Sequence, residues 1–141
     1  MGKKRIVNKT GMEEGAPKAQ SSSSKKKMDT ATLQVQSTYN NTKLILTDMK
    51  GNAVAWSSSG SLGFKGAKKG TPFAAAKVGE TLADKAIAMG VKEIAVIVKG
   101  VGSGRESSIR SFITKGINVM SISDRTPAPH NGVKAKKPRR V

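Results

Sequence analysis

Positive charge is spread unevenly along the chain, and this limits where a folded core can form. The 141 residues include 26 Lys and Arg against 9 Asp and Glu, which gives a net charge of +17. Residues 1–28 and 125–141 carry +6 each, whereas the much longer stretch 29–124 carries only +5. Short segments of one charge bury too little apolar surface to offset the entropy of ordering them. We therefore expect one folded domain over residues 29–124, with basic arms at 1–28 and 125–141 that are disordered in isolation.

The amino-acid composition excludes several classes of protein. The chain has no Cys, and its one His is His130, which excludes a disulfide scaffold, thiol catalysis and a multi-histidine metal site. Its apolar runs are far shorter than the ~20 residues that span a bilayer, and its N-terminus lacks the apolar stretch of a secretory signal. We expect a soluble, intracellular protein without metal, cofactor or membrane contact. The excess of positive charge favours nucleic acid as the partner.

Apolar spacing in the middle of the chain predicts five strands and two helices. Alternation of apolar and polar residues, as in Leu33-Gln34-Val35-Gln36, is typical of a half-buried strand. Helical spacing follows Thr71, which can cap a helix with Pro72 in its first turn and Gly90 at its end. The strands are expected at 31–38, 43–48, 53–59, 93–99 and 117–123, and the helices at about 72–89 and 105–115. Residues 93–99 are so continuously apolar that we expect both faces of this strand to be covered.

This order of elements indicates the fold class. Three strands of a meander, followed by helix, strand, helix and strand (βββαβαβ), predict an α/β domain with a mixed five-stranded sheet and helices packed on it. In the second helix Ile109, Phe112 and Ile113 are expected to point inward. Trp56, with Val54 on the same face of its strand, is expected in the core in preference to a base-stacking platform. Only five aromatic residues are present, which does not support a sheet that stacks several bases.

Two glycine-rich segments are candidates for contact with phosphate. Residues 100–106 (GVGSGRE) lie between a predicted strand and a helix N-terminus, where backbone N–H groups and the helix dipole favour anions. This segment could bind a dinucleotide, contact nucleic acid or serve only as a tight turn. Residues 57–70 combine four glycines with Lys65, Lys68 and Lys69 and could follow a sugar–phosphate backbone or form a flexible surface loop. Phe64 in this loop could stack on a base or hold the loop against the core.

Catalysis is the weaker interpretation of this sequence. A nuclease would need Asp48 and Asp124 to meet Glu80 or Glu106 around a metal ion, and the first strand carries no acid. On charge and glycine content alone, the sequence leaves open a generic nucleic-acid architectural protein and, less favoured, a nucleotide-dependent enzyme.

Several spaced motifs resemble those of one family. The segments QSTYNNTKLILTDMKGNAVAWSSSGSLGFKGAKKGTPFAAA, VKGVGSGRESSIR and SISDRTPAPHNG, followed by a basic tail, are similar to the universal small-subunit ribosomal protein S11 family in its bacterial form. Val101 stands where the family usually has proline. The resemblance implies a domain related to the ribonuclease-H-like motif but without its catalytic acids.

The same resemblance implies a structural, non-enzymatic role. It places the chain on the platform of the small ribosomal subunit, in the cytoplasm, bound to small-subunit ribosomal RNA near the messenger RNA exit path. The implied neighbours are the sixth, seventh, eighteenth and twenty-first small-subunit proteins. It also implies that Asn131, which precedes Gly132, converts to isoaspartate. The expected RNA-contacting residues are Tyr39, Asn40, Asn41, Thr42, Ser58, Gly60, Gly63, Phe64, Lys65, Gly66, Lys68, Lys69, Gly102, Ser103, Gly104, Arg105, Arg125, Thr126, Pro127, His130, Asn131, Gly132, Lys134, Lys136, Lys137, Arg139 and Arg140.

Overall fold

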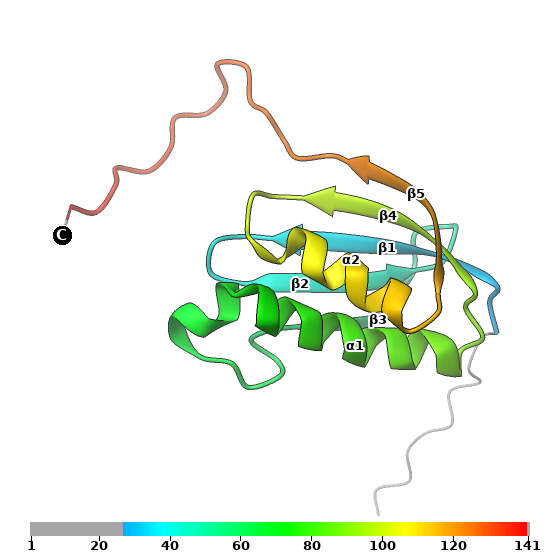
Figure 1. Ribbon diagram of the computed structural model, residues 1–141. Coiled ribbons are helices and arrows are strands. Elements are labelled where there is room, and N and C mark those ends of the chain that lie inside the picture. Colours follow the sequence, from blue (N-terminus) through cyan, green and yellow to red (C-terminus); the bar gives the residue numbers. More distant parts are fainter. Residues whose placement is uncertain (1–26, 141) are drawn as a thin grey trace, which may run out of the picture.

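The structure, a computed structural model, describes residues 27–140, so most of the N-terminal arm expected at 1–28 lies outside it. These residues form one α/β domain with five strands and two α-helices (Figure 1). The elements in chain order are β1 (Thr30–Ser37), β2 (Thr42–Thr47), β3 (Ala53–Ser58), the 3₁₀ turn η1 (Gly66–Gly70), α1 (Pro72–Ala88), β4 (Glu93–Lys99), α2 (Gly104–Thr114) and β5 (Asn118–Asp124).

The five strands form a single mixed sheet in the order β3-β2-β1-β4-β5. Strand β2 pairs antiparallel with β1 and β3, whereas β4 is parallel to β1 and β5 is parallel to β4. Both helices lie on the same face of the sheet (Figure 1). Because β1, β4 and β5 are parallel, the loops that follow these strands leave the sheet at the same edge. The candidate site lies at that edge.

The core lies between this face and the two helices. Alternate residues of β1, β2 and β4 point toward the helices, so Leu33, Leu44 and Ile94 are fully buried. Phe112 of α2 is the largest fully buried side chain among the described residues and packs in the same cluster. Burying an apolar side chain of this size contributes about 1.5–3 kcal/mol relative to leaving it in water.

Helix α1 begins and ends where its sequence signals predict. The hydroxyl of Thr71 accepts a hydrogen bond from the amide of Ala74 at 3.3 Å, and Pro72 occupies the first turn, where its missing N–H has no intrahelical partner to lose. Gly90 follows the helix in the left-handed region with φ +84°. These three predictions are confirmed.

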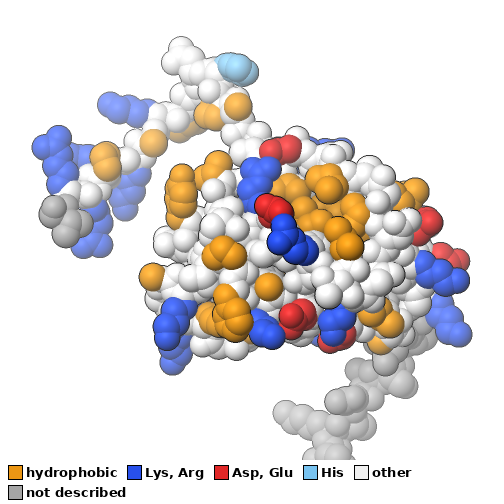
Figure 2. Space-filling view, in the orientation of Figure 1, with side chains coloured by type: hydrophobic (Ala, Val, Ile, Leu, Met, Phe, Trp, Pro, Cys, Tyr) orange, Lys and Arg blue, Asp and Glu red, His pale blue; other side chains and the backbone are white. Residues whose placement is uncertain are grey.

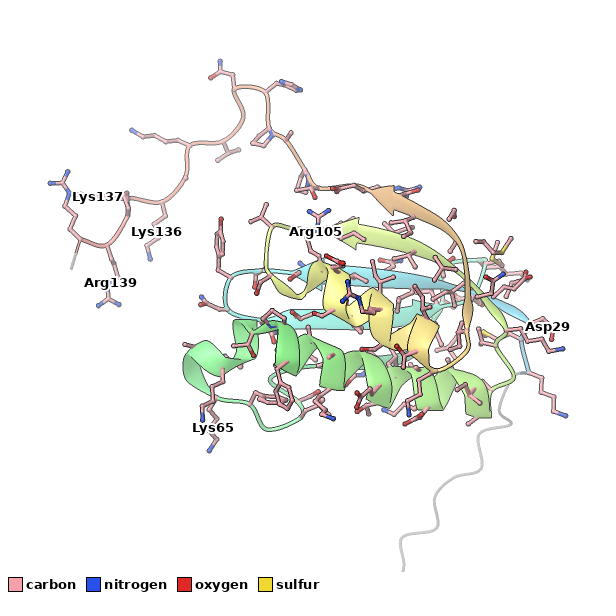
Figure 3. All side chains as sticks on the ribbon, in the orientation of Figure 1. Asp29, Lys65, Arg105, Lys136, Lys137 and Arg139 are labelled. Carbon is pink, nitrogen blue, oxygen red and sulfur yellow. The ribbon has the colours of Figure 1, made fainter. Side chains whose placement is uncertain are left out.

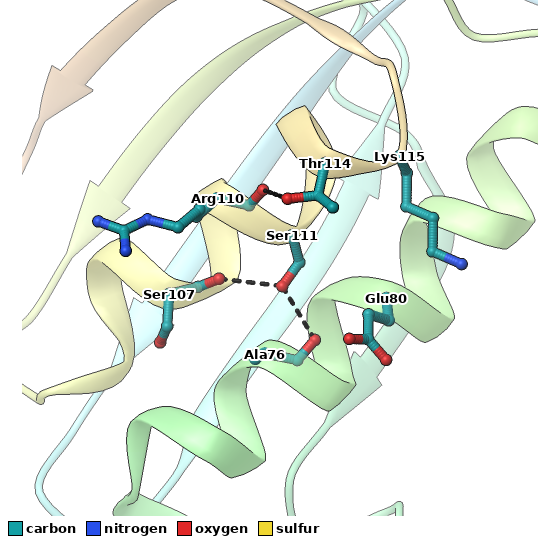
Figure 4. A pocket seen from close by; sticks show the side chains of 7 residues that line it. All are labelled: Ala76, Glu80, Ser107, Arg110, Ser111, Thr114 and Lys115. Carbon is teal, nitrogen blue, oxygen red and sulfur yellow. Dashed lines mark hydrogen bonds between the residues drawn. The ribbon is translucent and has the colours of Figure 1, made fainter.

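The two helices approach closely because a glycine lies at their crossing. A Cβ on Gly79 would lie 2.8 Å from the carbonyl oxygen of Ser108. The Ser111 hydroxyl lies 3.0 Å from the Ala76 carbonyl oxygen, across the helix contact, and 3.0 Å from the Ser107 carbonyl oxygen of its own helix (Figure 4). A hollow of about 190 Å³ lies beside this crossing, and Lys115 is one of the residues that line it. Lys115 forms an ion pair with Asp84, with 2.8 Å between Nζ and Oδ1. This pairing raises the pKa of Lys115.

Three expectations about burial are wrong, and two of them share a cause. Strand β4 is covered on one face only, so Ala95 and Ile97 are half-buried. Trp56 is 56% exposed, because it lies on the face of the sheet that no described helix covers. Ile113 is also 56% exposed, since α2 turns only Ile109 and Phe112 inward. Within residues 27–140, no helix is long and apolar enough to cross a membrane.

Candidate nucleic-acid interface

Four chain segments meet at one edge of the sheet. Strands β1, β3, β4 and β5 end there and β2 begins there, so the segments 38–41, 59–71, 100–103 and 125–140 all leave from this edge. Lys65, Arg105 and the labelled tail residues lie toward it in Figure 3, and Asp29 lies at the opposite end. Helices α1 and α2 also begin at this edge, which directs the positive ends of their dipoles toward it. We call these four segments the basic edge.

The first contact within the basic edge joins the β1–β2 turn to the long loop after β3. Ser59 is fully buried, and its hydroxyl lies 2.5 Å from Asn41 Oδ1 and 2.8 Å from the Lys69 carbonyl oxygen. The same hydroxyl accepts a hydrogen bond from the amide of Thr42 at 3.2 Å. Ser59 therefore holds both segments together. Sequence reasoning missed this role, because nothing separates Ser59 from the serines beside it except its long-range partners.

The glycine-rich turn after β4 lies directly against the end of β1. A Cβ on Gly100 would lie 2.0 Å from the carbonyl oxygen of Ser37, and one on Gly102 would lie 2.3 Å from that of Thr38. A Cβ on Gly104 would lie 2.3 Å from Thr42 Oγ1. Close packing of backbone on backbone accounts for these glycines, so the tight-turn interpretation explains them without a bound phosphate.

The turn is also tied to the loop on its other side. The Ser103 hydroxyl donates to the carbonyl oxygen of Gly70 at 2.7 Å. Gly70 itself packs on the first turn, since a Cβ there would lie 2.0 Å from the Tyr39 carbonyl oxygen. The three loops of the basic edge are thus interlocked and form one continuous surface.

Arg105 connects the glycine-rich turn to the start of the C-terminal segment. Its guanidinium donates to the Gly100 carbonyl oxygen and to Asp124 Oδ2, both at 2.6 Å. The hydroxyl and amide of Thr126 donate to Asp124 Oδ1 at 2.6 and 2.9 Å. Hydrogen bonds from Thr126 and Arg105 hold the pKa of Asp124 well below its usual range. The charge of Arg105 is therefore partly neutralised inside the protein.

The free charge of the basic edge lies on its loop and tail. Lys65 and Lys68 are exposed and Lys69 is half-buried, and residues 59–71 contain no acidic residue. Tyr39, in the neighbouring turn, is 78% exposed. Phe64 packs edge-on against Phe73 of α1 with 6.2 Å between ring centroids, so this ring holds the loop on the domain.

The C-terminal segment extends away from the domain. The amide of Arg125 donates to the Val98 carbonyl oxygen at 2.9 Å, which continues the pairing of β5 by one residue. Residues 127–140 are exposed and form neither helix nor strand. Figure 2 shows their Lys and Arg side chains standing clear of the domain. Asn131 has φ 53° and is the one residue other than glycine with positive φ among those described.

Four of the sequence-predicted contact residues lie beneath this surface. Thr42, Ser58, Gly102 and Gly104 are buried: Gly102 packs on the backbone after β1, and Gly104 packs on Thr42 and Ala75. Their direct contact with RNA stays a prediction, and in the free protein they lie beneath residues that are exposed. Sequence reasoning also missed Lys43 and Lys99, which are exposed where β2 begins and β4 ends. Their signal was a lysine at the polar positions of two predicted strands.

The acidic residues are separated and already engaged. Asp48 lies at the opposite end of the sheet from Asp124 and binds the turn amides of Lys50 and Asn52 at 2.9 and 2.8 Å. Hydrogen bonds from Asn52 lower its pKa. Glu80 pairs with Lys77 at 3.0 Å, and Glu106 pairs with Arg110. Within residues 27–140, no three His, Asp or Glu side chains come close enough to hold a metal ion.

The sequence was compared with models of known protein families, and one family matches the part of the chain that forms the basic edge. The family model described as ribosomal protein S11 matches residues 31–140, which is most of the chain and includes every segment of the basic edge. That family is a structural one of the small ribosomal subunit, which binds small-subunit ribosomal RNA in translation and is not an enzyme family. The chain therefore belongs to the ribosomal protein S11 family.

Proposed function

We propose that the basic edge and the C-terminal segment are the surface through which this protein holds small-subunit ribosomal RNA. One observation carries this proposal: four segments distant in sequence are interlocked at one edge, and the charged side chains that these segments carry are all Lys or Arg. The acids nearest this edge in the described part of the chain are paired: Asp124 with Arg105 at 2.6 Å, and Glu106, in the first turn of α2, with Arg110. Phosphate groups would therefore meet uncompensated charge on Lys65, Lys68 and the tail.

The tail extends this surface beyond the domain. Residues 134–140 contain Lys134, Lys136, Lys137, Arg139 and Arg140 without an acid. Because Arg125 and Thr126 are hydrogen-bonded to the domain, the tail leaves in a fixed direction and then follows the RNA. The N-terminal arm, with its own excess of +6 over residues 1–28, acts in the same way.

The finer placement follows from the family resemblance. We propose a position on the platform of the small subunit near the messenger RNA exit path, with the sixth, seventh, eighteenth and twenty-first small-subunit proteins as neighbours, in cytoplasmic ribosomes. The sheet order β3-β2-β1-β4-β5 supports a relation to the ribonuclease-H-like motif. The role is to hold RNA helices in position during assembly, which requires charge and rigidity but no reaction.

Binding of the full chain to a small-subunit ribosomal RNA transcript at several salt concentrations tests this surface. Replacing Lys65, Lys68 and Lys69 with Ala removes three charges, so the slope of log K against log salt falls by about two to three. The matched control replaces Lys50, Lys85 and Lys92, which are exposed at the opposite end of the domain. Equal loss in both variants would show that binding follows net charge alone, without a located interface.

A competition assay with the same transcript distinguishes specific binding to ribosomal RNA from the generic nucleic-acid binding of an architectural protein. With an equal mass of duplex DNA as competitor, we expect ribosomal RNA to remain bound. Displacement by duplex DNA at equal phosphate concentration would favour the architectural alternative.

A further inference from the structure

The face of the sheet opposite the helices is uncovered among the described residues, and its side chains are arranged in rows. Strand register places Lys43, Gln36 and Lys99 side by side across β2, β1 and β4, at the end of the face next to the basic edge. The next row holds Trp56, Ile45, Gln34 and Ile97 across β3, β2, β1 and β4. A basic row is thus followed directly by an apolar row with an amide at its centre.

Two shallow hollows mark this part of the face. One, of about 210 Å³, is lined by Lys43, Ile45, Ala53 and Trp56. The other, of about 130 Å³, is lined by Gln34, Gln36, Ile45, Ile97 and Lys99 together with Val35. Ile45 lines both hollows, so they adjoin along the apolar row.

The charge around these hollows has a single sign. Lys43 and Lys99 are exposed, and neither is in an ion pair among residues 27–140. The acid on this face of β4 is Glu93, six residues from Lys99 along the strand, on the order of 20 Å away. A partner that fits must combine negative charge with a flat apolar surface.

An unpaired nucleotide has this combination. Its base presents a flat π-face to Trp56, its phosphate is attracted to Lys43 or Lys99, and its polar edge can exchange hydrogen bonds with the amides of Gln34 and Gln36. Trp56 is diagonal to Lys43 across the β2–β3 pair, a separation of about 7–8 Å that a lysine side chain can span. A protein segment would need acidic side chains at both lysines in addition to an apolar face, whereas a nucleotide combines the two in one unit.

We propose that this face is a second RNA-binding surface, on which an unpaired base of small-subunit ribosomal RNA stacks on Trp56 while its phosphate lies against Lys43. The proposal rests on the proposed function, since it extends RNA contact from the basic edge onto the adjoining sheet. It needs one aromatic residue only, so the scarcity of aromatic residues in the chain does not oppose it.

Trp56 is the one tryptophan of the chain, so its fluorescence reports on this face alone. In the free protein, acrylamide should quench it strongly, because the side chain is more than half exposed. Adding the ribosomal RNA transcript should reduce both the fluorescence and its quenching by acrylamide. A perfectly paired RNA duplex should bind the basic edge and leave quenching unchanged, because its bases are not free to stack.

Substitutions complete the test. Trp56→Ala should weaken binding to the transcript about tenfold, while Trp56→Phe, which keeps a ring, should bind within about threefold of the wild type. Ile87→Ala is the matched control, an exposed apolar residue on the helix side, and should bind as the wild type. Circular dichroism of each variant separates a loss of fold from a loss of binding.

The outcomes distinguish this proposal from the function it rests on. If Trp56 stays open to acrylamide in the RNA complex and Trp56→Ala binds normally, the proposal is overturned, even if the Lys65, Lys68 and Lys69 variant still loses salt dependence. The same holds if Trp56 is protected only in whole small subunits, since a protein would then cover it. If Trp56 is protected by RNA but the lysine variant binds normally, the stacking proposal stands and the basic edge fails.

Discussion

Arg105 and Asp124, nineteen residues apart in the chain, meet at 2.6 Å where the C-terminal segment leaves the domain. The contact joins the first turn of α2 to the last residue of β5, and Thr126 completes it by donating to the same carboxylate. The Thr126 hydroxyl also accepts a hydrogen bond from the amide of Gly100 at 3.2 Å. These four residues fix the direction in which the basic tail begins.

The titration of Asp124 should reveal this contact. Hydrogen bonds from Thr126 and Arg105 lower its pKa, so its stabilising effect is complete above the ordinary value of 3.8 and is lost only as pH falls through the lowered pKa. We expect no inflection of the Asp124 carboxyl ¹³C resonance between pH 7 and pH 3.8. In Thr126→Val, which removes the hydrogen bond that lowers the pKa most, the midpoint should rise toward 3.8. A wild-type midpoint already near 3.8 would mean that the contact is not formed in solution.

Gly102→Ala should destabilise the domain, because the added Cβ would lie 2.3 Å from the Thr38 carbonyl oxygen. Backbone must move to admit it, and we expect a loss of about 1–3 kcal/mol in the free energy of unfolding by urea denaturation. Gly60→Ala is the control, since its Cβ would find no atom closer than 3.8 Å. There the change should stay within about 0.5 kcal/mol. Equal stability of the two variants would contradict the close packing of the glycine-rich turn on β1.

The sequence predicted the strands and helices well because each has a local signal. Alternation marked β1, and Thr71, Pro72 and Gly90 marked the ends of α1. Local signals do not say whether a sheet is covered on one face or on both. The sequence therefore predicts burial for Trp56 and for both faces of β4, whereas the core lies on one face of the sheet only. The helical spacing in α2 likewise grouped Ile113 with Phe112 without showing how wide the buried stripe is.

The candidate site was predicted in part for the same reason. Charge and glycine content identified the segments 57–70 and 100–106. The contacts that join them to each other through Gly70, and to the β1–β2 turn through Ser59 and Asn41, depend on residues far apart in sequence. Burial of Thr42 and Gly104 beneath that contact follows from the fold and not from residue type. That Lys43 neighbours Trp56, and that Lys99 lies on the same face three strands away, is known only once the strand order is known.

Phe112 and Ile113 are adjacent in α2 and should respond very differently to truncation. Phe112 is fully buried against the sheet, so Phe112→Ala should cost about 3–5 kcal/mol in the free energy of unfolding. Ile113 is more than half exposed, and Ile113→Ala should change it by no more than about 0.5 kcal/mol. Thermal and urea unfolding of both variants measures this difference. Similar losses would show that a further element covers Ile113 in the full chain.

Asn131 should convert to isoaspartate more readily than the other asparagines in the described part of the chain. It is exposed, lies in the left-handed region at φ 53°, and is followed by Gly132, whose amide no side chain shields. Attack of the Gly132 nitrogen on the Asn131 side-chain carbonyl releases ammonia and forms a succinimide, which water opens mainly to isoaspartate. Gly132→Ala adds a Cβ that finds only an ordinary contact at 3.5 Å with Pro129, so it should slow the conversion without disturbing the segment. Peptide mass spectrometry combined with isoaspartyl methylation measures the conversion, and an unmodified Asn131 in purified small subunits would refute it.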